Sequence, residues 1–333
     1  MELLDNFGRI HNYLRVSLTD RCNLNCSYCN PLRDNSAKMN RTEMLSFDEL
    51  SRLLVLFLSE LGIRKIRFTG GEPFVRKEII NFFRSVGRLK SKYDFEFALT
   101  TNGTLLKDHL AELKSIGLDK LNISLDSLKP YTFRYLTGSN KLQDVIDAVN
   151  IAGETGFSSL KINTVILKGI NDNEIIDFVN FIKNRPVTLR FIEYMPFGNN
   201  SWDDKKFISA KDVKQIIEKC FDITKVADEP DSVAESYKLS NFIGKVGFIS
   251  PVSDHFCTSC SRLRLKANGT MKLCLFSDPA EEIDLKKYLR SGYASNQELK
   301  EIIFNSLRLK KLQHASVEEL LRSGTSNMTE TGG

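Results

Sequence analysis

The stretch Tyr13-Leu14-Arg15-Val16-Ser17-Leu18-Thr19 alternates apolar and polar side chains and runs directly into a loop rich in cysteine. Alternation with a period of two predicts a β-strand with two unlike faces. The leucines and valine share the apolar face, which suits contact with helices. Arg15 and the hydroxyl side chains share the other face, so this strand predicts a sheet with one polar, solvent-accessible face.

Five further segments show a strand pattern, and helical patterns lie between them. Strands are predicted over 13–19, 63–69, 95–100, 120–125, 159–167 and 187–193, and helices over 47–61, 77–90, 107–116, 142–154, 172–183 and 210–221. Ser46 and Ser209 each precede an acidic residue by three positions, which is typical of a helix N-cap. Six consecutive βα units predict a parallel sheet with helical crossovers.

The polar face of these strands decides between an open doubly wound sheet and a barrel. A doubly wound sheet is covered by helices on both faces and reads as apolar on both. Here the strands place Arg67, Asn122, Lys161 and Arg190 opposite their apolar neighbours. A closed eight-stranded barrel fills its interior with branched apolar residues. We therefore predict an incomplete (β/α)6 TIM-type barrel with a polar, cationic lumen.

The loop after the first strand carries Cys22, Cys26 and Cys29 at the spacing C-x3-C-x2-C. Thiolates this close can converge on one soft metal centre. Closed zinc sites and simple iron–sulfur clusters usually take four protein ligands. Three cysteines therefore favour a [4Fe–4S] cluster with one iron open to a ligand, and a zinc loop is the alternative.

Other distinctive sequences also follow predicted strands. Gly70-Gly71-Glu72-Pro73 follows the second strand, Thr101-Asn102-Gly103 the third, Asp126-Ser127 the fourth and Met195-Pro196 the sixth. In barrels the carboxyl ends of the strands build the active site. Paired glycines let the backbone approach a ligand closely. These loops are therefore expected to surround one site.

The βα pattern ends after residue 221, and 225–233 is an acidic, proline-containing linker or surface loop. We predict two domains, a partial barrel over 1–225 and a smaller α+β region over 226–333. The second region has strand-like runs at 242–250 and 262–266. It also carries Cys257, Cys260 and Cys274. Spacing leaves open whether these hold a second three-cysteine cluster or, with His255, a zinc ion.

The C-terminus is predicted to be helical to about Leu321, and a polar tail follows, ending in Gly332-Gly333. Composition alone favours disorder for such a tail.

Composition limits the class of protein. The chain has 333 residues, 41% hydrophobic and 27% charged, as in ordinary globular proteins, and a formal net charge of +5. This charge suits anionic ligands but does not predict nucleic-acid binding. No apolar run approaches the roughly 20 residues that span a bilayer. Seven cysteines without a signal-peptide pattern favour metal binding in the cytoplasm over disulfides. Cys220 ends a helical pattern and is predicted to be a core residue.

The cysteine loop, with the aromatic Tyr28 before the last cysteine, resembles the signature of radical S-adenosylmethionine (SAM) enzymes. The whole chain from about residue 8 resembles one family among them, the GTP 3′,8-cyclases of molybdenum cofactor biosynthesis. The motifs that carry this resemblance are Thr19-Asp20-Arg21-Cys22-Asn23, Arg67-x-Thr69-Gly70-Gly71-Glu72-Pro73, Thr100-Thr101-Asn102-Gly103, Asn122-x-Ser124-x-Asp126-Ser127, Lys161-x-Asn163, Leu189-Arg190-Phe191-Ile192-Glu193, Cys257-x2-Cys260-x-Arg262-Leu263-Arg264, Cys274-Leu275-Phe276 and the Gly-Gly terminus. Two departures are Asn30, where the family has Met, and Ser261, where it has Asn.

The resemblance implies a role for particular residues. It implies that Cys22, Cys26 and Cys29 hold a [4Fe–4S] cluster that cleaves SAM, and that Cys257, Cys260 and Cys274 hold a second one, whose open iron binds the guanine base. SAM would contact Tyr28, Gly71, Ser124 and Met195. GTP would contact Arg15, Arg67, Thr100, Lys161, Arg262, Leu263 and Arg264. Glu72 and Asn102 are hypothesised to support SAM, and the Gly-Gly tail to reach the active site.

The implied activity is that of a lyase. A 5′-deoxyadenosyl radical abstracts hydrogen from C3′ of the GTP ribose, and the product is 3′,8-cyclo-7,8-dihydro-GTP. Implied partners are an electron donor of the flavodoxin or ferredoxin type and cyclic pyranopterin monophosphate synthase. A monomer or homodimer is expected, with no nucleic-acid or membrane partner. The alternatives are a peptide-modifying maturase, a two-cluster electron carrier and a zinc-stabilised nucleotide-binding protein.

Overall fold

One large sheet organises the chain. The structure, a computed structural model, describes residues 2–29, 38–197, 200, 202–228, 232–291, 295–323 and 328–332. Within these residues, twelve strands form one sheet in the order β12-β11-β10-β1-β2-β3-β4-β5-β6-β9-β8-β7. The strands are β1 (Tyr13–Ser17), β2 (Lys65–Thr69), β3 (Glu96–Thr101), β4 (Lys120–Ser124), β5 (Ser159–Ile166), β6 (Thr188–Glu193), β7 (Ile223–Lys225), β8 (Glu235–Leu239), β9 (Lys245–Ile249), β10 (Arg262–Leu265), β11 (Thr270–Lys272) and β12 (Ile283–Asp284).

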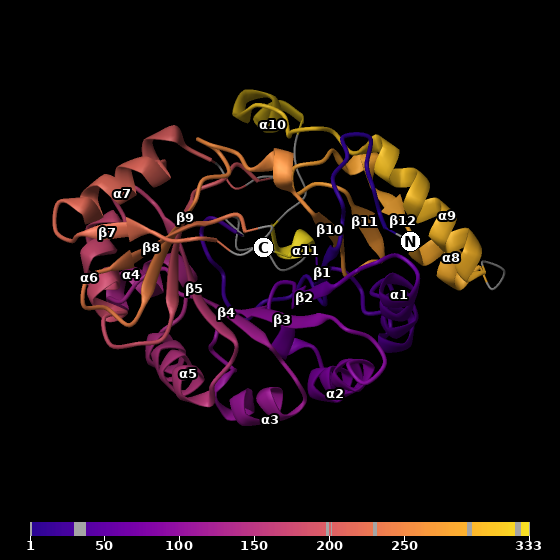
Figure 1. Cartoon of the computed structure of the whole chain (residues 1–333), viewed down its shortest axis with the longest axis horizontal. Coiled ribbons are helices and arrows are strands. Elements are labelled where there is room, and N and C mark those ends of the chain that lie inside the picture. Colours follow the sequence, from indigo (N-terminus) through magenta and orange to yellow (C-terminus); the bar gives the residue numbers. More distant parts are fainter. Residues whose placement is uncertain are drawn as a thin grey trace.

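The centre of this sheet is parallel. Strands β1 to β6 pair in chain order, β10 adds in parallel to β1, and β9 adds in parallel to β6. The outer pairs, β10 with β11, β11 with β12, β7 with β8 and β8 with β9, are antiparallel. Figure 1 shows the sheet curving around a central space without closing. The prediction of an incomplete TIM-type barrel is therefore confirmed.

Helices cover the outside of this curve, as Figure 1 shows for α1, α2, α3 and α5. The helices are α1 (Phe47–Ser59), α2 (Ile79–Leu89), α3 (Leu110–Ser115), α4 (Pro130–Thr137), α5 (Leu142–Thr155), α6 (Ile175–Phe181), α7 (Ala210–Glu218), α8 (Lys286–Arg290), α9 (Asn296–Ser306), α10 (Val317–Ser323) and α11 (Met328–Thr331). The predicted caps are present. Ser46 and Glu49 form a capping box, and the Ser209 side chain accepts a hydrogen bond from the Asp212 amide.

The apolar face of the strands packs against these helices. Phe68 on β2 contacts Phe83 on α2 and Phe97 on β3, with ring centroids 5.6 Å apart in both pairs. All three rings are fully buried. Burying side chains of this size is the main favourable contribution to such a core. Because side chains alternate along a strand, the same packing turns the polar residues of β1 to β6 toward the lumen.

The C-terminal region completes this sheet. The predicted strand runs at 242–250 and 262–266 appear as β9 and β10, whereas β7, β8, β11, β12 and the helix α4 were not predicted. Strands from both sides of residue 225 belong to the same sheet. The division into domains at 225 and 226 stays a prediction.

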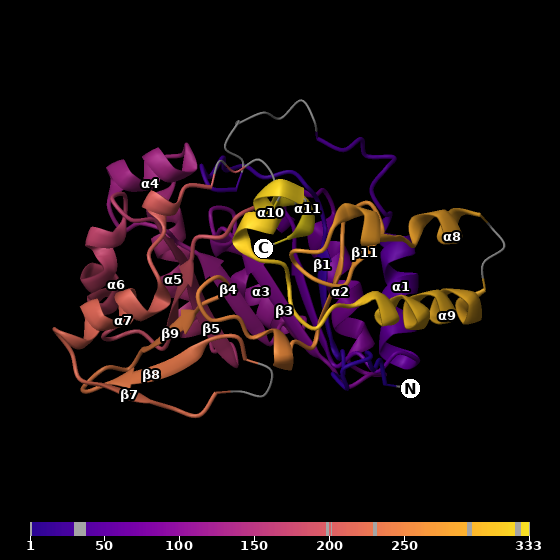
Figure 2. The same cartoon turned by 90° about the horizontal axis from the view of Figure 1, so that it is seen from above.

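The tail returns to the centre of the molecule. Figures 1 and 2 both place α11 over the barrel. Thr331 and Gly332 are buried, and a side chain at Gly332 would lie 2.5 Å from Cγ2 of Thr69. Disorder, which composition favoured for this tail, is therefore wrong for residues 328–332. Gly333 lies outside the described residues.

Candidate active site

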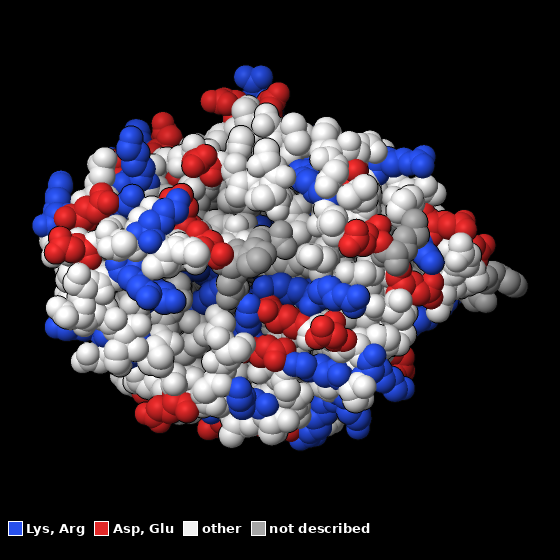
Figure 3. Space-filling view, viewed as in Figure 1, with Lys and Arg blue, Asp and Glu red and all other residues white. Residues whose placement is uncertain are grey.

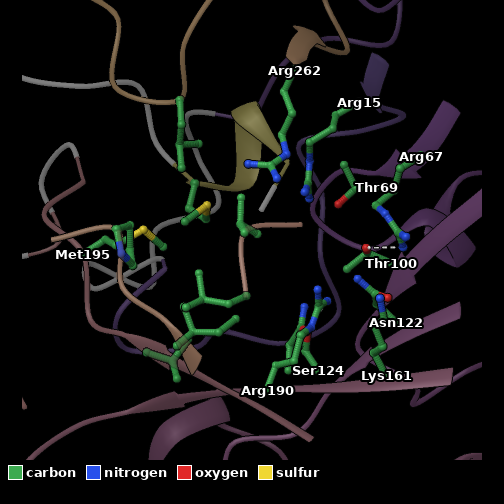
Figure 4. Close-up of a pocket in the computed structure, with 18 of the residues that line it drawn as sticks. Arg15, Arg67, Thr69, Thr100, Asn122, Ser124, Lys161, Arg190, Met195 and Arg262 are labelled. Atoms are coloured by element: carbon green, nitrogen blue, oxygen red, sulfur yellow. Dashed lines mark hydrogen bonds between the residues drawn. The ribbon is translucent and has the colours of Figure 1, made fainter. Parts of the chain in front are cut away.

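A cavity of about 310 Å³ fills the lumen. Side chains from β1 to β6, from the cysteine loop and from the C-terminal region line it. Figure 3 shows the same face hollowed near its centre, with Lys and Arg along the lower rim of the hollow. In Figure 4, Arg15, Arg67 and Arg262 enter the cavity from one side, and Met195 lies across from them.

Three neighbouring strands supply a compact group of cations. In the register of the sheet, Arg15 on β1 pairs with Arg67 on β2 and with Arg264 on β10. One pleat earlier, Tyr13 pairs with Lys65 and with Arg262. Directly paired residues on neighbouring strands point to the same face. All six side chains line the cavity, so the sheet itself assembles five positive charges around one phenol.

The electrostatics of this group favour an anionic ligand. Burial is the largest cause that lowers the pKa of Arg15, to about 9; Tyr13 opposes this effect, and the repulsion of Arg264, Arg67 and Arg262 adds to it. Burial is also the largest cause that lowers the pKa of Arg264. Holding like charges together in a buried site costs free energy that a polyanion would recover. Arg67, Arg262 and Arg264 are each less than a tenth exposed.

The opposite wall carries amides and two further cations. Lys161 on β5 and Arg190 on β6 line the cavity with Asn122 and Asn163. Arg190 donates from Nε and Nη2 to Oδ1 of Asn163 at 3.0 and 2.6 Å. On the near wall, Arg67 Nη1 donates to the Leu99 carbonyl at 2.9 Å, and a dashed line in Figure 4 marks its longer bond to Thr100.

The cysteine loop is held against the Gly-Gly turn after β2. The Gly71 amide donates to the Thr19 carbonyl at 2.7 Å, and the Glu72 amide donates to the Arg21 carbonyl at 2.8 Å. A β-carbon at Gly71 would lie 2.2 Å from the Arg21 carbonyl oxygen. Only glycine permits this approach of two backbones, so the pair of glycines positions the loop that carries the cysteines.

Cys22, Cys26 and Cys29 line the cavity beside this turn. Burial raises the pKa of all three thiols, to about 12 for Cys29. The Cys22 sulfur accepts hydrogen bonds from the Leu24 amide at 3.4 Å and from Asn102 Nδ2 at 3.6 Å. Thiolates buried in this way require a compensating positive centre, which a bound cluster provides.

Two carboxylates support this loop from below. Glu72 is fully buried and accepts from the Asn102 amide at 2.7 Å and from Thr101 Oγ1 at 2.8 Å, although burial raises its pKa to about 7. Asp126 accepts from the Tyr28 hydroxyl at 2.7 Å. Burial raises the pKa of Asp126 to about 6. Asn102 lines the cavity, whereas Glu72 acts on it through Asn102.

The second cysteine group lies near the arginines of β10. Cys257 begins a short 3-10 turn (Cys257–Ser259), and Cys260 precedes β10 by two residues. Burial raises the pKa of Cys257. Burial acts in the same direction on Cys260, but Lys310, Arg262 and Arg264 outweigh it and lower the pKa of Cys260. These cations stabilise a thiolate, and therefore an anionic cluster, at this place.

The number of cysteines in each group fits a [4Fe–4S] cluster with one open iron. Within the described ranges, no three His, Cys, Asp or Glu side chains are placed to hold one metal ion. In a [4Fe–4S] cluster each cysteine binds a different iron, so the ligands stand farther apart than around zinc. His255, the fourth ligand of the zinc alternative, packs edge-on against His314 at 5.1 Å.

Most residues predicted for the site do meet in the cavity. Those that line it are Arg15, Cys22, Cys26, Tyr28, Cys29, Arg67, Gly71, Thr100, Ser124, Lys161, Met195, Arg262 and Arg264. Cys257, Cys260 and Cys274 are not among the lining residues, but their neighbours Phe256, Ser261 and Leu275 are. Leu263 stays a prediction, although its side chain does not line the cavity. It is fully buried in the core because it alternates with two arginines on β10.

Three residues outside the predicted ligand sets are Asn30 and Ser261, which differ from the family pattern, and Cys220. Asn30 lies outside the described residues. Ser261 lines the cavity, and its buried hydroxyl has no hydrogen-bond partner in the part of the chain that the structure describes. Cys220 is exposed, so its prediction as a core residue is wrong. It lies beyond the end of α7, whose buried positions are Ala210, Val213 and Ile217.

Tyr13 and Lys65 are among the lining residues that sequence reasoning missed. Both lie two positions from a predicted cation on the same strand face, Tyr13 from Arg15 and Lys65 from Arg67. The period of two that identified the arginines could have identified these as well.

Comparison with known proteins agrees with this geometry. Residues 16–182 match the family model of the radical SAM superfamily, and residues 187–316 match the model Molybdenum Cofactor Synthesis C. The GTP 3′,8-cyclase of Desulforamulus reducens is 44% identical over 94% of this chain and 95% of its own length. The mitochondrial GTP 3′,8-cyclase of Arabidopsis thaliana is 41% identical over 99% of this chain and 83% of its own length.

Some relatives are longer. This chain spans about half of the human molybdenum cofactor biosynthesis protein 1, to which it is 39% identical, covering 49% of that protein. Among solved structures, Streptococcus suis SuiB bound to S-adenosylmethionine has a TM-score of 0.59 at 15% identity, over 89% of this chain and 68% of that one. This likeness concerns the fold alone. No helix among the described residues is long and apolar enough to cross a membrane.

Proposed function

This chain belongs to the radical SAM family of GTP 3′,8-cyclases, and we propose that it converts GTP to 3′,8-cyclo-7,8-dihydro-GTP in molybdenum cofactor biosynthesis. The observation that supports this most directly is the group of cations on β10, β1 and β2, beside the cavity between the two cysteine groups. A triphosphate is the part of GTP that needs several arginine and lysine donors.

The two clusters are assigned by the chemistry of their surroundings. Cys22, Cys26 and Cys29, on the loop that lines the cavity, would hold the cluster that binds SAM. Cys257, Cys260 and Cys274, beside the cations of β10, would hold the second cluster. When bound, the first cluster would supply the electron for cleavage of SAM to a 5′-deoxyadenosyl radical, which would take hydrogen from C3′ of the ribose so that this carbon could bond to C8 of guanine.

The residues of the chain bind and orient the two ligands. Arg15, Arg67, Arg262 and Arg264, with Lys161 and Thr100 on the neighbouring walls, bind GTP. Tyr28, Gly71, Ser124 and Met195 surround SAM, and Asn102 contributes a hydrogen bond to the Cys22 sulfur. The buried C-terminal residues Thr331 and Gly332 cover the lumen and exclude water from it.

Partners follow from the reaction. A flavodoxin or ferredoxin type donor supplies the electron, and cyclic pyranopterin monophosphate synthase takes the product. Two further predictions concern the oligomeric state, a monomer or homodimer, and a cytoplasmic location.

The decisive experiment is anaerobic incubation of the reconstituted protein with SAM, dithionite and GTP. The proposal expects 5′-deoxyadenosine to form in a GTP-dependent way, together with the cyclised nucleotide. If 5′-deoxyadenosine forms equally without GTP, or only with a peptide, the cyclase assignment fails. Metal analysis tests the remaining alternative, because two four-iron clusters give about eight irons per chain and a zinc protein gives stoichiometric zinc.

A further inference from the structure

Tyr13 occupies the centre of the cation group on β10, β1 and β2. It is the first residue of β1 and pairs with Lys65 on one side and Arg262 on the other. Its side chain is 7% exposed and lines the cavity. A tyrosine here interrupts a wall that is otherwise built of positive charge.

Tyr13 contacts three cations, one through its hydroxyl and two through its ring. Its hydroxyl accepts a hydrogen bond from Arg67 Nε at 2.8 Å. Lys65 Nζ lies 5.0 Å from the ring centroid, and the Arg262 guanidinium lies 5.7 Å from it. Both distances are within the range of a cation–π interaction. The ring therefore separates two cations and the hydroxyl holds a third.

The bond to Arg67 fixes the plane of that guanidinium. Nε is held by Tyr13, and Nη1 by the Leu99 carbonyl at 2.9 Å. Because two of its nitrogens are hydrogen-bonded, the Arg67 guanidinium cannot rotate freely. A guanidinium group whose orientation is fixed before binding loses less conformational entropy when it binds a phosphate.

We propose that Tyr13 is a positioning residue for the triphosphate, which orients Arg67 through its hydroxyl and spaces Lys65 from Arg262 through its ring. This inference rests on the proposed function, because the phosphates of GTP are the ligand that these cations would bind. The Tyr13 hydroxyl then increases the affinity for the phosphates of GTP and takes no part in binding guanine or SAM.

The charge around Tyr13 makes this role dependent on pH. Burial raises the pKa of the phenol, but Arg67, Arg15, Arg262 and Lys65 outweigh burial and lower it to about 7. The charged groups on the packed strands are Arg15 on β1, Lys65 and Arg67 on β2, and Arg262 and Arg264 on β10. Glu96 on β3 pairs with Lys65 at 2.7 Å. A phenolate would compete with phosphate for the same cations, so a bound triphosphate favours the protonated phenol.

The test compares GTP binding to anaerobic, cluster-loaded wild-type protein and to Tyr13→Phe, which keeps the ring and removes the hydroxyl. At pH 6 we expect Tyr13→Phe to raise the Kd for GTP about tenfold, or about 1.4 kcal/mol. The Kd for guanosine should change less than twofold, and kcat at saturating GTP should be retained. Between pH 6 and 8.5 the ratio of the two GTP Kd values should fall toward one.

Tyr237→Phe is a matched control. Tyr237 is also buried on a strand, has Lys214 Nζ over its ring at 4.6 Å and donates to Glu235 at 3.1 Å. This control should bind GTP as the wild type does. Should Tyr13→Phe unfold or lose iron, 3,5-difluorotyrosine at position 13 replaces it, and the pH dependence of GTP affinity must then shift to lower pH.

The outcomes separate the two proposals. Wild-type protein that fails to bind GTP overturns the proposed function. Wild-type protein that binds GTP, while Tyr13→Phe binds it equally well at pH 6, overturns the role of Tyr13 alone. An equal loss of GTP and guanosine affinity would also overturn it, because the effect would then not concern the phosphates.

Discussion

Arg15 on β1 and Arg264 on β10 are direct partners in a parallel pair of strands, although they come from opposite ends of the chain. Both enter the same cavity. This pairing joins the first strand, which leads into Cys22, to the strand that follows Cys260. Because the strands are parallel, Cys22 lies beyond the carboxyl end of β1 and Cys260 lies before the amino end of β10, so these two cysteines stand at opposite ends of the strand pair.

The same pairing predicts that Arg15 strengthens GTP binding but lowers the stability of the fold. Replacing Arg15 with Met removes one of several buried like charges and should raise the melting temperature by a few degrees. The same change should raise the Kd for GTP at least about tenfold. Calorimetry and GTP binding measure the two effects.

Arg84→Met serves as the control for this substitution. The Arg84 side chain is half exposed and pairs with Glu112 on the outer surface. We expect unchanged GTP affinity for this variant. A fall in the melting temperature of Arg15→Met would contradict the charge argument.

The two cysteine groups should be separable by mutation. Cys274→Ala should lower the iron content from about eight to about four per chain and abolish cyclisation, yet leave reductive cleavage of SAM. Cys22→Ala should lose a similar amount of iron together with SAM cleavage. Iron analysis, electron paramagnetic resonance and 5′-deoxyadenosine formation report these differences.

Cys220→Ser is the matched variant, because Cys220 is exposed and apart from both groups. It should retain all iron and activity. Loss of iron in this variant would show that a cysteine outside the two groups contributes to a cluster.

Gly332 is predicted to fix the tail in the lumen. Its φ is +75°, and an added Cβ would lie 2.5 Å from Thr69 Cγ2. Gly332→Ala should displace the tail and lower kcat for cyclisation at least about tenfold, because water then enters the site. Gly156, with φ of +78° and no atom within 4 Å of an added Cβ, gives the matched variant Gly156→Ala.

Both substitutions impose similar backbone strain, so a loss of activity limited to Gly332→Ala identifies the clash. Limited proteolysis of the C-terminus provides the structural measurement. Equal activity of the two variants would argue against a role for the tail.

His11 predicts a specific acid sensitivity. Burial and the charge of Lys310 lower its pKa to about 4, while Nε2 lies 3.0 Å from Asp5 Oδ2 and the buried Nδ1 has no partner among the described residues. The unfolded state binds more protons between pH 6.5 and 4, so the free energy of unfolding decreases as the pH falls through this window. A shift of this size corresponds to about 3 kcal/mol.

His11→Gln keeps a donor toward Asp5 without the titration. Urea unfolding from pH 7 to 4 should therefore show a weaker pH dependence for His11→Gln than for the wild type. Parallel curves for the two proteins would mean that His11 does not titrate in this range.

Local pattern was sufficient for much of the fold and site. The period of two placed Arg15, Arg67 and Lys161 in the lumen, because side chains of a strand alternate whatever the strand pairs with. The same alternation explains why the Leu263 side chain does not line the cavity, since Leu263 lies between two arginines on a strand. Helix starts such as Ser46 were predictable because a cap depends on residues three positions apart.

The sequence by itself determined the two groups of three cysteines, the six βα units and the polar face of their strands, since each depends on residues that are close in the chain. Tertiary structure alone decided that β10 pairs with β1, that Tyr13 stands between Lys65 and Arg262, and that Gly332 lies against Thr69. The physical reason is that the register between distant strands follows from how the curved sheet and its covering helices pack as a whole. The periodicity within one strand contains no information on which distant strand it pairs with.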